Sequence, residues 1–258
     1  MIITLLILGL LGGFLSGMLG VGGAVIMIPL MLTVPPLVGA GELTMTEVAG
    51  LSMIQVLVSS VSGMIIHKKN NFVNGRVLVS VGIPMGIFAL FGAYLSKHMG
   101  DRILLLFFGF LVLVAFIMLL LKKEKNEVST APAEEFQFRL IPSLLIGAFV
   151  GFMSGAVGAG GGFILIPLMV TVLRVPLKVT VGTSLGIVFI GALTGSIGKI
   201  LSMQVSLMTV IPLIIGSIPA AQLGAKCSKA MKPSTVRYLL LAVVFLSAAK
   251  VWWKILAG

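Results

Sequence analysis

The sequence predicts an all-α membrane protein made of two related halves, each with a helix that glycines interrupt. Three observations predict it. The chain is strongly apolar, with 59% hydrophobic and 10% charged residues and a mean hydropathy of +1.22 over 258 residues. Apolar runs of about 20 residues, each long enough to cross roughly 30 Å of hydrocarbon, recur along it. A glycine-rich phrase occurs twice inside these runs, at a constant offset of 138 residues.

The composition excludes an ordinary soluble domain, in which roughly half of the residues are apolar and about a quarter are charged. The net charge is +11, but the basic residues are confined to short segments between apolar runs. This placement indicates orientation in a bilayer rather than nucleic-acid binding. Cys227 is the single cysteine, so no internal disulfide is expected. The first eleven residues lack a basic region, so no cleavable signal is expected either.

Each glycine phrase lies where a membrane helix would be expected to continue. Glycine tolerates positive φ and costs about 1 kcal/mol relative to alanine inside a helix. We therefore expect a turn in each copy, with two helical arms around it. The alternative is a continuous helix with a small-residue packing face, as the Gly13 and Gly17 pair alone would suggest. The expected turn residues are Gly20, Gly22 and Gly23, and then Gly158, Gly160, Gly161 and Gly162.

The chain divides into a first transmembrane repeat at 1–121, a polar linker at 122–139 and a second transmembrane repeat at 140–258. The linker is rich in Lys and Glu, as expected of a solvated segment. Beyond the glycine phrase the halves match at an offset of 132, where Ser52 meets Ser184. The expected apolar segments lie at about 2–34, 46–66, 76–96, 103–121, 140–173, 180–198, 205–225 and 236–256.

The basic residues favour inverted repeats, each a glycine-broken re-entrant hairpin plus three transmembrane helices. If all eight segments crossed the membrane, Lys and Arg would divide ten to eight, which orients nothing. If each glycine-broken segment enters and leaves the membrane on the same side, thirteen Lys and Arg residues lie on one side of the membrane and five on the other. Cytoplasmic loops are enriched in Lys and Arg, so we expect a cytoplasmic linker and both termini outside. The five are Lys97, Arg102, Lys199, Lys250 and Lys254.

The repeated Gly-Phe-x-Ser-Gly-x-x-Gly-x-Gly-Gly phrase is followed by a proline, and Val181-Gly182-Thr183-Ser184-Leu185 follows the second copy. This pattern resembles the sulfite exporter TauE/SafE family of bacterial membrane proteins, over nearly the whole chain. The resemblance implies a plasma (inner) membrane transporter that moves small sulfur-containing anions outward, such as sulfite, sulfoacetate or related sulfonates. The alternatives are an importer of another inorganic or organic anion, or a membrane scaffold that transports nothing. The first half departs from the second where Ala24 replaces Gly162 and Leu51 replaces Thr183.

The residues themselves suit anion binding without a buried cation. Lys199 and Lys250 lie near segment ends, where a lysine is expected to reach the membrane interface. An anion would then be bound near the bilayer midplane by backbone N–H groups at the helix starts after the turns, with hydroxyls and amides. Removing Lys199 should have little effect. The expected substrate-binding residues are Gly20, Gly22, Gly23, Ser52, Gln55, Gly158, Gly160, Gly161, Thr183, Ser184 and Gln222.

An enzyme is not expected. Gly182–Gly186 matches the Gly-x-Ser-x-Gly pattern of a nucleophilic serine. The chain has two histidines, His67 and His98, both in basic segments, so Ser184 would lack a base. No metal site or cofactor is expected. Glu47, with its neighbour Glu42, is read as a solvated helix start, with binding of a coupling cation as the alternative. The expected partners are a small anion and the lipid bilayer, with no nucleic acid and a homodimer left open.

Overall fold

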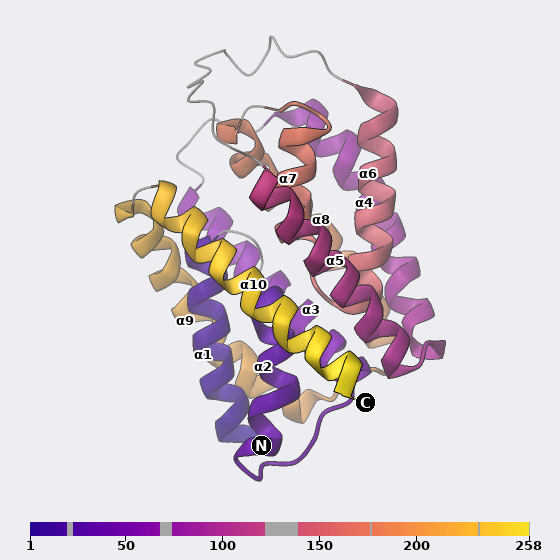
Figure 1. The fold of residues 1–258 in the computed structure, drawn as a ribbon, viewed down its shortest axis with the longest axis vertical. Helices are drawn as coiled ribbons and strands as arrows, with labels where there is room; N and C mark the ends of the chain where they lie inside the picture. Colours follow the sequence, from indigo (N-terminus) through magenta and orange to yellow (C-terminus); the bar gives the residue numbers. More distant parts are fainter. Residues whose placement is uncertain (20–22, 68–73, 122–138, 176, 232, 258) are drawn as a thin grey trace.

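The computed structural model describes residues 1–19, 23–67, 74–121, 139–175, 177–231 and 233–257. Within these residues the chain forms ten α-helices and one short 3₁₀-helix (η1), with no strand (Figure 1). Each of the eight predicted apolar segments contains one or two of these helices. The elements are α1 Ile2–Leu19, α2 Ala24–Leu37, α3 Met45–His67, α4 Gly75–Leu95, η1 Ser96–His98, α5 Asp101–Leu121, α6 Leu140–Val157, α7 Gly162–Thr171, α8 Leu177–Leu201, α9 Leu207–Ala230 and α10 Pro233–Ala257.

Polar side chains define where the helices of the first half begin. The Glu47 N–H donates to Thr44 Oγ1 at 3.2 Å, and the Thr44 N–H donates to the Glu47 carboxylate at 2.8 Å. This reciprocal pair is a capping box at the start of α3. At the start of α4 the Asn74 side chain accepts from the Val77 N–H at 3.1 Å. Glu47 is therefore a capping residue, as its solvated interpretation predicts.

Each glycine phrase interrupts a helix, as predicted. The first phrase separates α1 from α2, and the second separates α6 from α7. Gly162 was expected in the second turn, but this was wrong: it is the first residue of α7. Gly161 already supplies the left-handed N-cap conformation, so the helix begins directly after it. Gly20 and Gly22 lie outside the described residues.

Two helix interfaces between the halves have the same design. In α1 packed on α9, and in α6 packed on α4, a glycine every fourth residue faces a backbone carbonyl so closely that an added Cβ would overlap it. Small residues of this kind allow membrane helices to approach at backbone distance. The two sets differ by the offsets of 138 and 132 throughout. They are Gly9, Gly13 and Gly17 against Leu213, Ser217 and Ala221, and Gly147, Gly151 and Gly155 against Val81, Met85 and Ala89.

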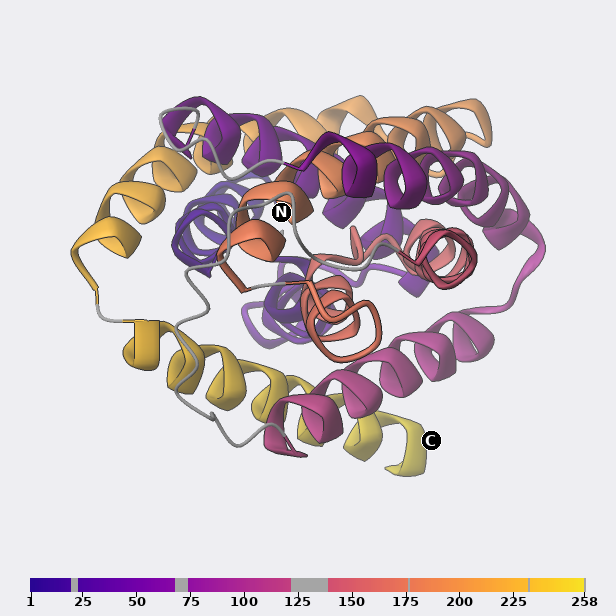
Figure 2. The same cartoon turned by 90° about the horizontal axis from the view of Figure 1, so that it is seen from above.

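Other helix contacts between the halves follow the same exchange. α3 packs on α9 as α8 packs on α4, and α2 packs on α10 as α7 packs on α5. The equivalent pairs α3 with α8 and α5 with α10 contact each other directly. Seen from above, α5 and α10 cross along one side of the molecule, and α1 and α6 are viewed nearly end-on in the interior (Figure 2). Because the main contacts run between the halves, neither half packs as a separate domain.

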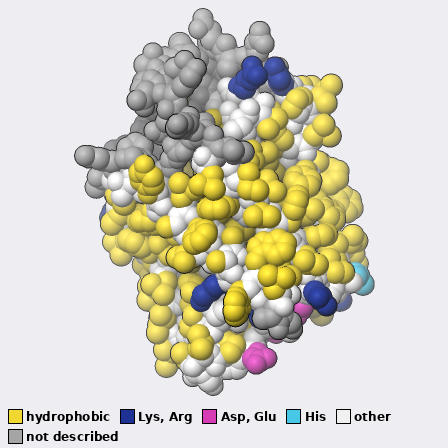
Figure 3. Space-filling view, viewed as in Figure 1, with side chains coloured by type: hydrophobic (Ala, Val, Ile, Leu, Met, Phe, Trp, Pro, Cys, Tyr) yellow, Lys and Arg dark blue, Asp and Glu magenta, His cyan; other side chains and the backbone are white. Residues whose placement is uncertain are grey.

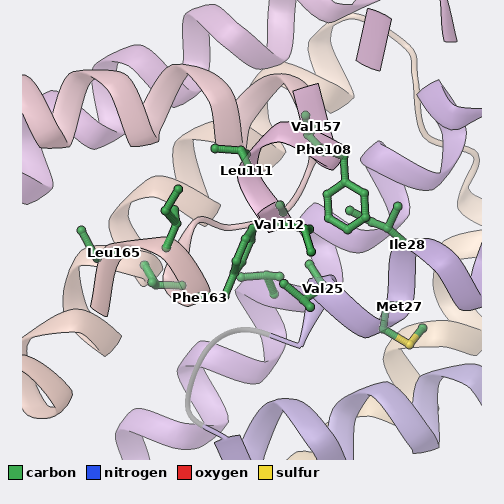
Figure 4. Close-up of a cluster of buried hydrophobic side chains, with 14 of the residues drawn as sticks. Val25, Met27, Ile28, Phe108, Leu111, Val112, Val157, Phe163 and Leu165 are labelled. Carbon is green, nitrogen blue, oxygen red and sulfur yellow. The ribbon is translucent and has the colours of Figure 1, made fainter. Parts of the chain in front are cut away.

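The arms that follow the two turns share one apolar core. Val25, Met27 and Ile28 of α2 and Phe163 and Leu165 of α7 are all buried. They gather around buried residues of α5, and Val157 at the end of α6 joins them (Figure 4). α2 of the first glycine-broken segment packs on α10, whereas both arms of the second, α6 and α7, pack on α5. The α5 residues in this cluster include Phe108, Leu111 and Val112.

The outer surface is that of a membrane protein. Seven of the described helices are long and apolar enough to span a bilayer: α1, α4, α5, α6, α8, α9 and α10. Large apolar side chains are exposed all along them. Figure 3 shows a broad band of hydrophobic side chains, with charged side chains above and below it. Such a surface is stable in lipid, which solvates apolar side chains as well as the protein interior does.

Candidate functional site

The second glycine turn is buried, and its backbone conformation disfavours residues other than glycine. Gly158, Gly160 and Gly161 have φ values of 76°, 64° and 69°, in the left-handed region that favours glycine. The Gly158 and Ala159 N–H groups both donate to Ser154 O, at 2.8 and 3.0 Å, which ends α6. All four residues of the turn are buried. The turn therefore places unwound backbone inside the protein, next to the start of α7.

One face of α3 fits against this turn. An added Cβ on Gly158 would overlap the Ala49 carbonyl, and one on Gly160 would overlap the Val56 side chain. Between them the Ser52 hydroxyl contacts Gly158 O at 2.9 Å and Val48 O at 2.7 Å. Only glycine leaves room for this contact. A helix of the first half thus holds the turn of the second half.

The first turn is described at its end only. Gly23 has a φ of 65° and caps α2, and an added Cβ would lie 2.6 Å from Ser16 Cβ. The offsets of 132 and 138 make Ser184 and Gly20 the counterparts of Ser52 and Gly158. Ser184 is buried near the start of α8.

Gln55 has the most unusual environment of the predicted site residues. Its side chain is 0% exposed, and neither Oε1 nor Nε2 has a hydrogen-bond partner among the described residues. An added Cβ on Gly12 of α1 would overlap Nε2 and the Met27 side chain of α2. The amide therefore lies between the two arms of the first broken helix. Leaving such a buried group unpaired costs about 1–3 kcal/mol, so a ligand for it has a large effect.

Ser59 was not predicted, although it follows Gln55 by one helical turn on the same face of α3. Its hydroxyl is buried and has no partner among the described residues, and the same holds for Ser196 of α8. The spacing of four from Gln55 was the available signal for Ser59. Nothing in the sequence distinguishes Ser196 from a helix-packing serine.

Two predicted residues lie elsewhere. The Thr183 hydroxyl accepts from the Asn74 N–H at 3.1 Å, so it supports the start of α4. Gln222 is exposed on α9 and does not share the interior with the others. Adjacent residues of a helix point in different directions, which separates Thr183 from Ser184.

Lys199 departs most from its expected place. The side chain was expected at the membrane interface, but it is 0% exposed. Its ammonium donates to Ser96 Oγ at 2.6 Å, Ala156 O at 2.9 Å and Gln204 Oε1 at 2.9 Å. These partners lie after α4, at the end of α6 and in the loop after α8. The position of Lys199 near the end of an apolar segment suggested a side chain at the membrane interface. The loop after α8 instead folds Gln204 back over the lysine. At the offset of 132, Lys199 corresponds to His67 of the first half. This correspondence was the one signal in the sequence that both halves place a basic residue at this position.

Within the described part of the chain, no three His, Cys, Asp or Glu side chains gather as a metal site would require. His98 lies in η1 beside Tyr94, with ring centroids 6.5 Å apart, and the His67 side chain lies outside the description. What the described interior offers a ligand is backbone N–H groups, hydroxyls, the amides of Gln55 and Gln204 and the ammonium of Lys199. These groups suit an anion.

Comparison with known proteins identifies the family. The family model described as sulfite exporter TauE/SafE matches residues 5–251. The chain belongs to the sulfite exporter TauE/SafE family. It is 25% identical to the probable membrane transporter protein YunE of Bacillus subtilis, over 95% of this chain and 94% of the other. It is also 25% identical to the probable membrane transporter protein MJ0441 of Methanocaldococcus jannaschii, over 93% and 91%. No solved structure matches.

Membership of the TauE/SafE family, together with seven apolar helices, makes the chain a multi-pass transporter of the plasma membrane. A further relative, a probable membrane transporter protein of Haemophilus influenzae, is 29% identical over 76% of this chain and 72% of its own. These relatives are named as transporters, so the TauE/SafE member is not an enzyme. The prediction from the glycine phrases is confirmed at this level.

Proposed function

We propose that the protein exports small sulfur-containing anions, such as sulfite, sulfoacetate or related sulfonates, through a site between the two glycine turns. The observation that carries the proposal is the buried second turn, whose backbone is unwound against α3. In a membrane protein, unwound backbone at depth is tolerated where protein buries it or where it lines a water-filled cavity, and transporters use such backbone to bind ions. The description of the family as sulfite exporters supports the outward direction.

The two turns and their arms form re-entrant hairpins in this proposal. A Cβ added to Gly41, after α2, would lie 3.3 Å from Met1 Cε, so the chain returns after α2 to the end where α1 begins. In Figure 1 the chain enters α1 at the lower end and α6 at the upper end. The exchange of equivalent contacts between the halves is consistent with two repeats related by a pseudo-two-fold axis, and an inverted repeat is one such arrangement.

The anion is bound mainly by partial charges. The first N–H groups of α2 and α7 have no partner within their helices, and the helix dipole makes both ends positive. Gln55 adds a buried amide donor beside the first turn. Ser52 of α3 contacts the second turn, and Ser184 of α8 is the counterpart of Ser52 in the other half. Partial charges bind a divalent anion weakly enough for release, which transport requires.

The test is transport by purified protein in proteoliposomes. Sulfite, sulfoacetate, sulfate and thiosulfate are compared as cargo, and Gly160→Val serves as the inactive control. We expect movement of sulfite or a sulfonate by the wild type alone, with competition among the accepted anions. Preference for an anion without sulfur would favour the alternative importer of other anions. Absence of transport for every anion, by folded protein, would favour the scaffold.

A further inference from the structure

A buried lysine joins three helix ends beside the second glycine turn. The Lys199 ammonium has three N–H donors, and Ser96, Ala156 and Gln204 accept one each. Three acceptors lie within 2.9 Å of the nitrogen, one for each N–H of an ammonium. As an ammonium, Lys199 places a positive charge inside the protein.

The described part of the chain places no carboxylate against this lysine. Among the described residues its partners are a hydroxyl, a carbonyl and an amide, all neutral. Glu42, Glu47 and Asp101 are exposed outside the interior, and the other four acidic residues belong to the linker. An uncompensated buried charge is costly, and in membrane proteins such residues mark substrate or ion pathways.

Capping α6 does not explain the charge. Ala156 O is among the last carbonyls of α6, which lack partners within the helix and attract a cation. A neutral donor would satisfy that carbonyl equally well, at far lower cost of desolvation. The Gln204 amide already does so for Ala93 O, at 3.0 Å. The positive charge of Lys199 therefore has a further use.

We propose that Lys199 is the counter-charge for the transported anion. When the anion binds, it replaces Ser96 and Gln204 as the ligand of the Lys199 ammonium. The inference rests on the proposed function and adds a fixed cation to the site. Ala156 lies two residues before Gly158, so the ammonium adjoins the second turn.

The displaced groups keep other partners. Ser96 Oγ contacts Ala93 O at 2.6 Å and Gln204 Oε1 at 3.1 Å. Gln204 Nε2 donates to Ser202 Oγ at 2.6 Å as well as to Ala93 O. Exchange of these neutral ligands for an anion therefore leaves no buried polar group unpaired. Gln204 sits in a loop whose neighbour Met203 is 89% exposed, so the lysine lies directly beneath the surface there.

The test is anion binding by purified full-length protein in detergent, measured as the rise in Tm on titration with sulfite, sulfoacetate, sulfate and thiosulfate. Lys199→Met should weaken binding about tenfold or more, the factor for one lost hydrogen bond to a charged group. Lys199→Arg, which keeps the charge, should retain more affinity than Lys199→Met. Lys250→Met removes an exposed lysine of α10 and should bind as the wild type does.

Gln204→Ala provides a second test that keeps the ammonium. Removing a competing neutral ligand should leave anion affinity unchanged or raise it. A tenfold loss of affinity would overturn the proposal that the anion replaces Gln204 at the Lys199 ammonium. This arm decides the matter if Lys199→Met fails to fold. Equal binding by wild type and folded Lys199→Met would overturn the counter-charge and leave the proposed function standing. If the wild type neither binds nor transports any of the anions, the proposed function itself fails.

Discussion

The Ser52 hydroxyl lies 2.9 Å from the carbonyl oxygen of Gly158, so that α3 of one half contacts the glycine turn of the other. The residues belong to different repeats and are 106 positions apart. Since Ser184 and Gly20 are their counterparts, the sequence repeat provides for the same contact at the first turn. Each turn would then depend on the opposite half, which couples the two halves during transport.

Ser52→Ala and Ser184→Ala should destabilise the protein to a similar extent. Loss of the hydroxyl leaves a buried carbonyl with one partner fewer, at a cost of about 1–3 kcal/mol. The measurement is the thermal unfolding of each variant in detergent, together with substrate affinity, which should fall because the turn is no longer held. Thr209→Ala, with an exposed hydroxyl, is the control. Sensitivity of Ser52 alone would show that the repeats use their serines differently.

Gly160→Val should abolish transport while the protein still inserts. Position 160 has a φ of 64°, where a branched side chain is strongly disfavoured, and Val56 occupies the space that a Cβ needs. Gly160→Ala combined with Val56→Ala separates these causes, because it removes the overlap and keeps the strain. Gly75→Ala is the control, since nothing lies within 4 Å of its Cβ. Near-normal proteoliposome transport by Gly160→Val would assign this turn to packing alone.

Helix positions were predictable from the sequence because apolar runs must be long enough to cross lipid. The turns were predictable too, because dense glycine is costly in a helix unless the backbone needs it. The alternative interpretation, a small-residue packing face on a helix, applies to Gly13 and Gly17, which pack against α9. Gly158 and Gly160 instead turn the chain. Spacing of four distinguishes the first kind from the second.

Side-chain partners were not predictable in the same way. Lys199 is near a helix end in the sequence, and its burial depends on a loop that folds Gln204 inward and on the ends of α4 and α6. These contacts join residues 103, 43 and 5 positions apart, with no local pattern to indicate them. For the same reason Gln222, in an apolar helix, was expected inside although it is exposed.

Gly13→Leu and Gly151→Leu should reduce stability by similar amounts, because each glycine faces a carbonyl across an equivalent interface. Overpacking of a tight contact costs about 1–3 kcal/mol, and more where backbone must move. The yield of folded protein and its Tm give the comparison. Gly100→Leu, in open space before α5, should leave both unchanged. A large effect at Gly13 with none at Gly151 would contradict the equivalence of the interfaces.

The inverted arrangement predicts which loops are cytoplasmic. Single cysteines at Asn70, Ser129 and Ser234 should all be protected from an impermeant thiol reagent applied outside intact cells, because thirteen of the eighteen Lys and Arg residues lie on their side. Cys227 is exposed, so the background is Cys227→Ser. A cysteine at Met203 should be labelled, since the loop after α8 lies on the opposite side.

Eight full crossings predict a different pattern from the same variants. The loop of Met203 would then share a side with Ser129, and Ser234 would lie opposite both. Labelling at Ser234 with protection at Ser129 and Met203 would therefore overturn the inverted arrangement, and with it the re-entrant hairpins. If Met203 is the one labelled position among these four variants, each half must cross the membrane an odd number of times. Only then do equivalent loops of the two halves face opposite sides of the membrane.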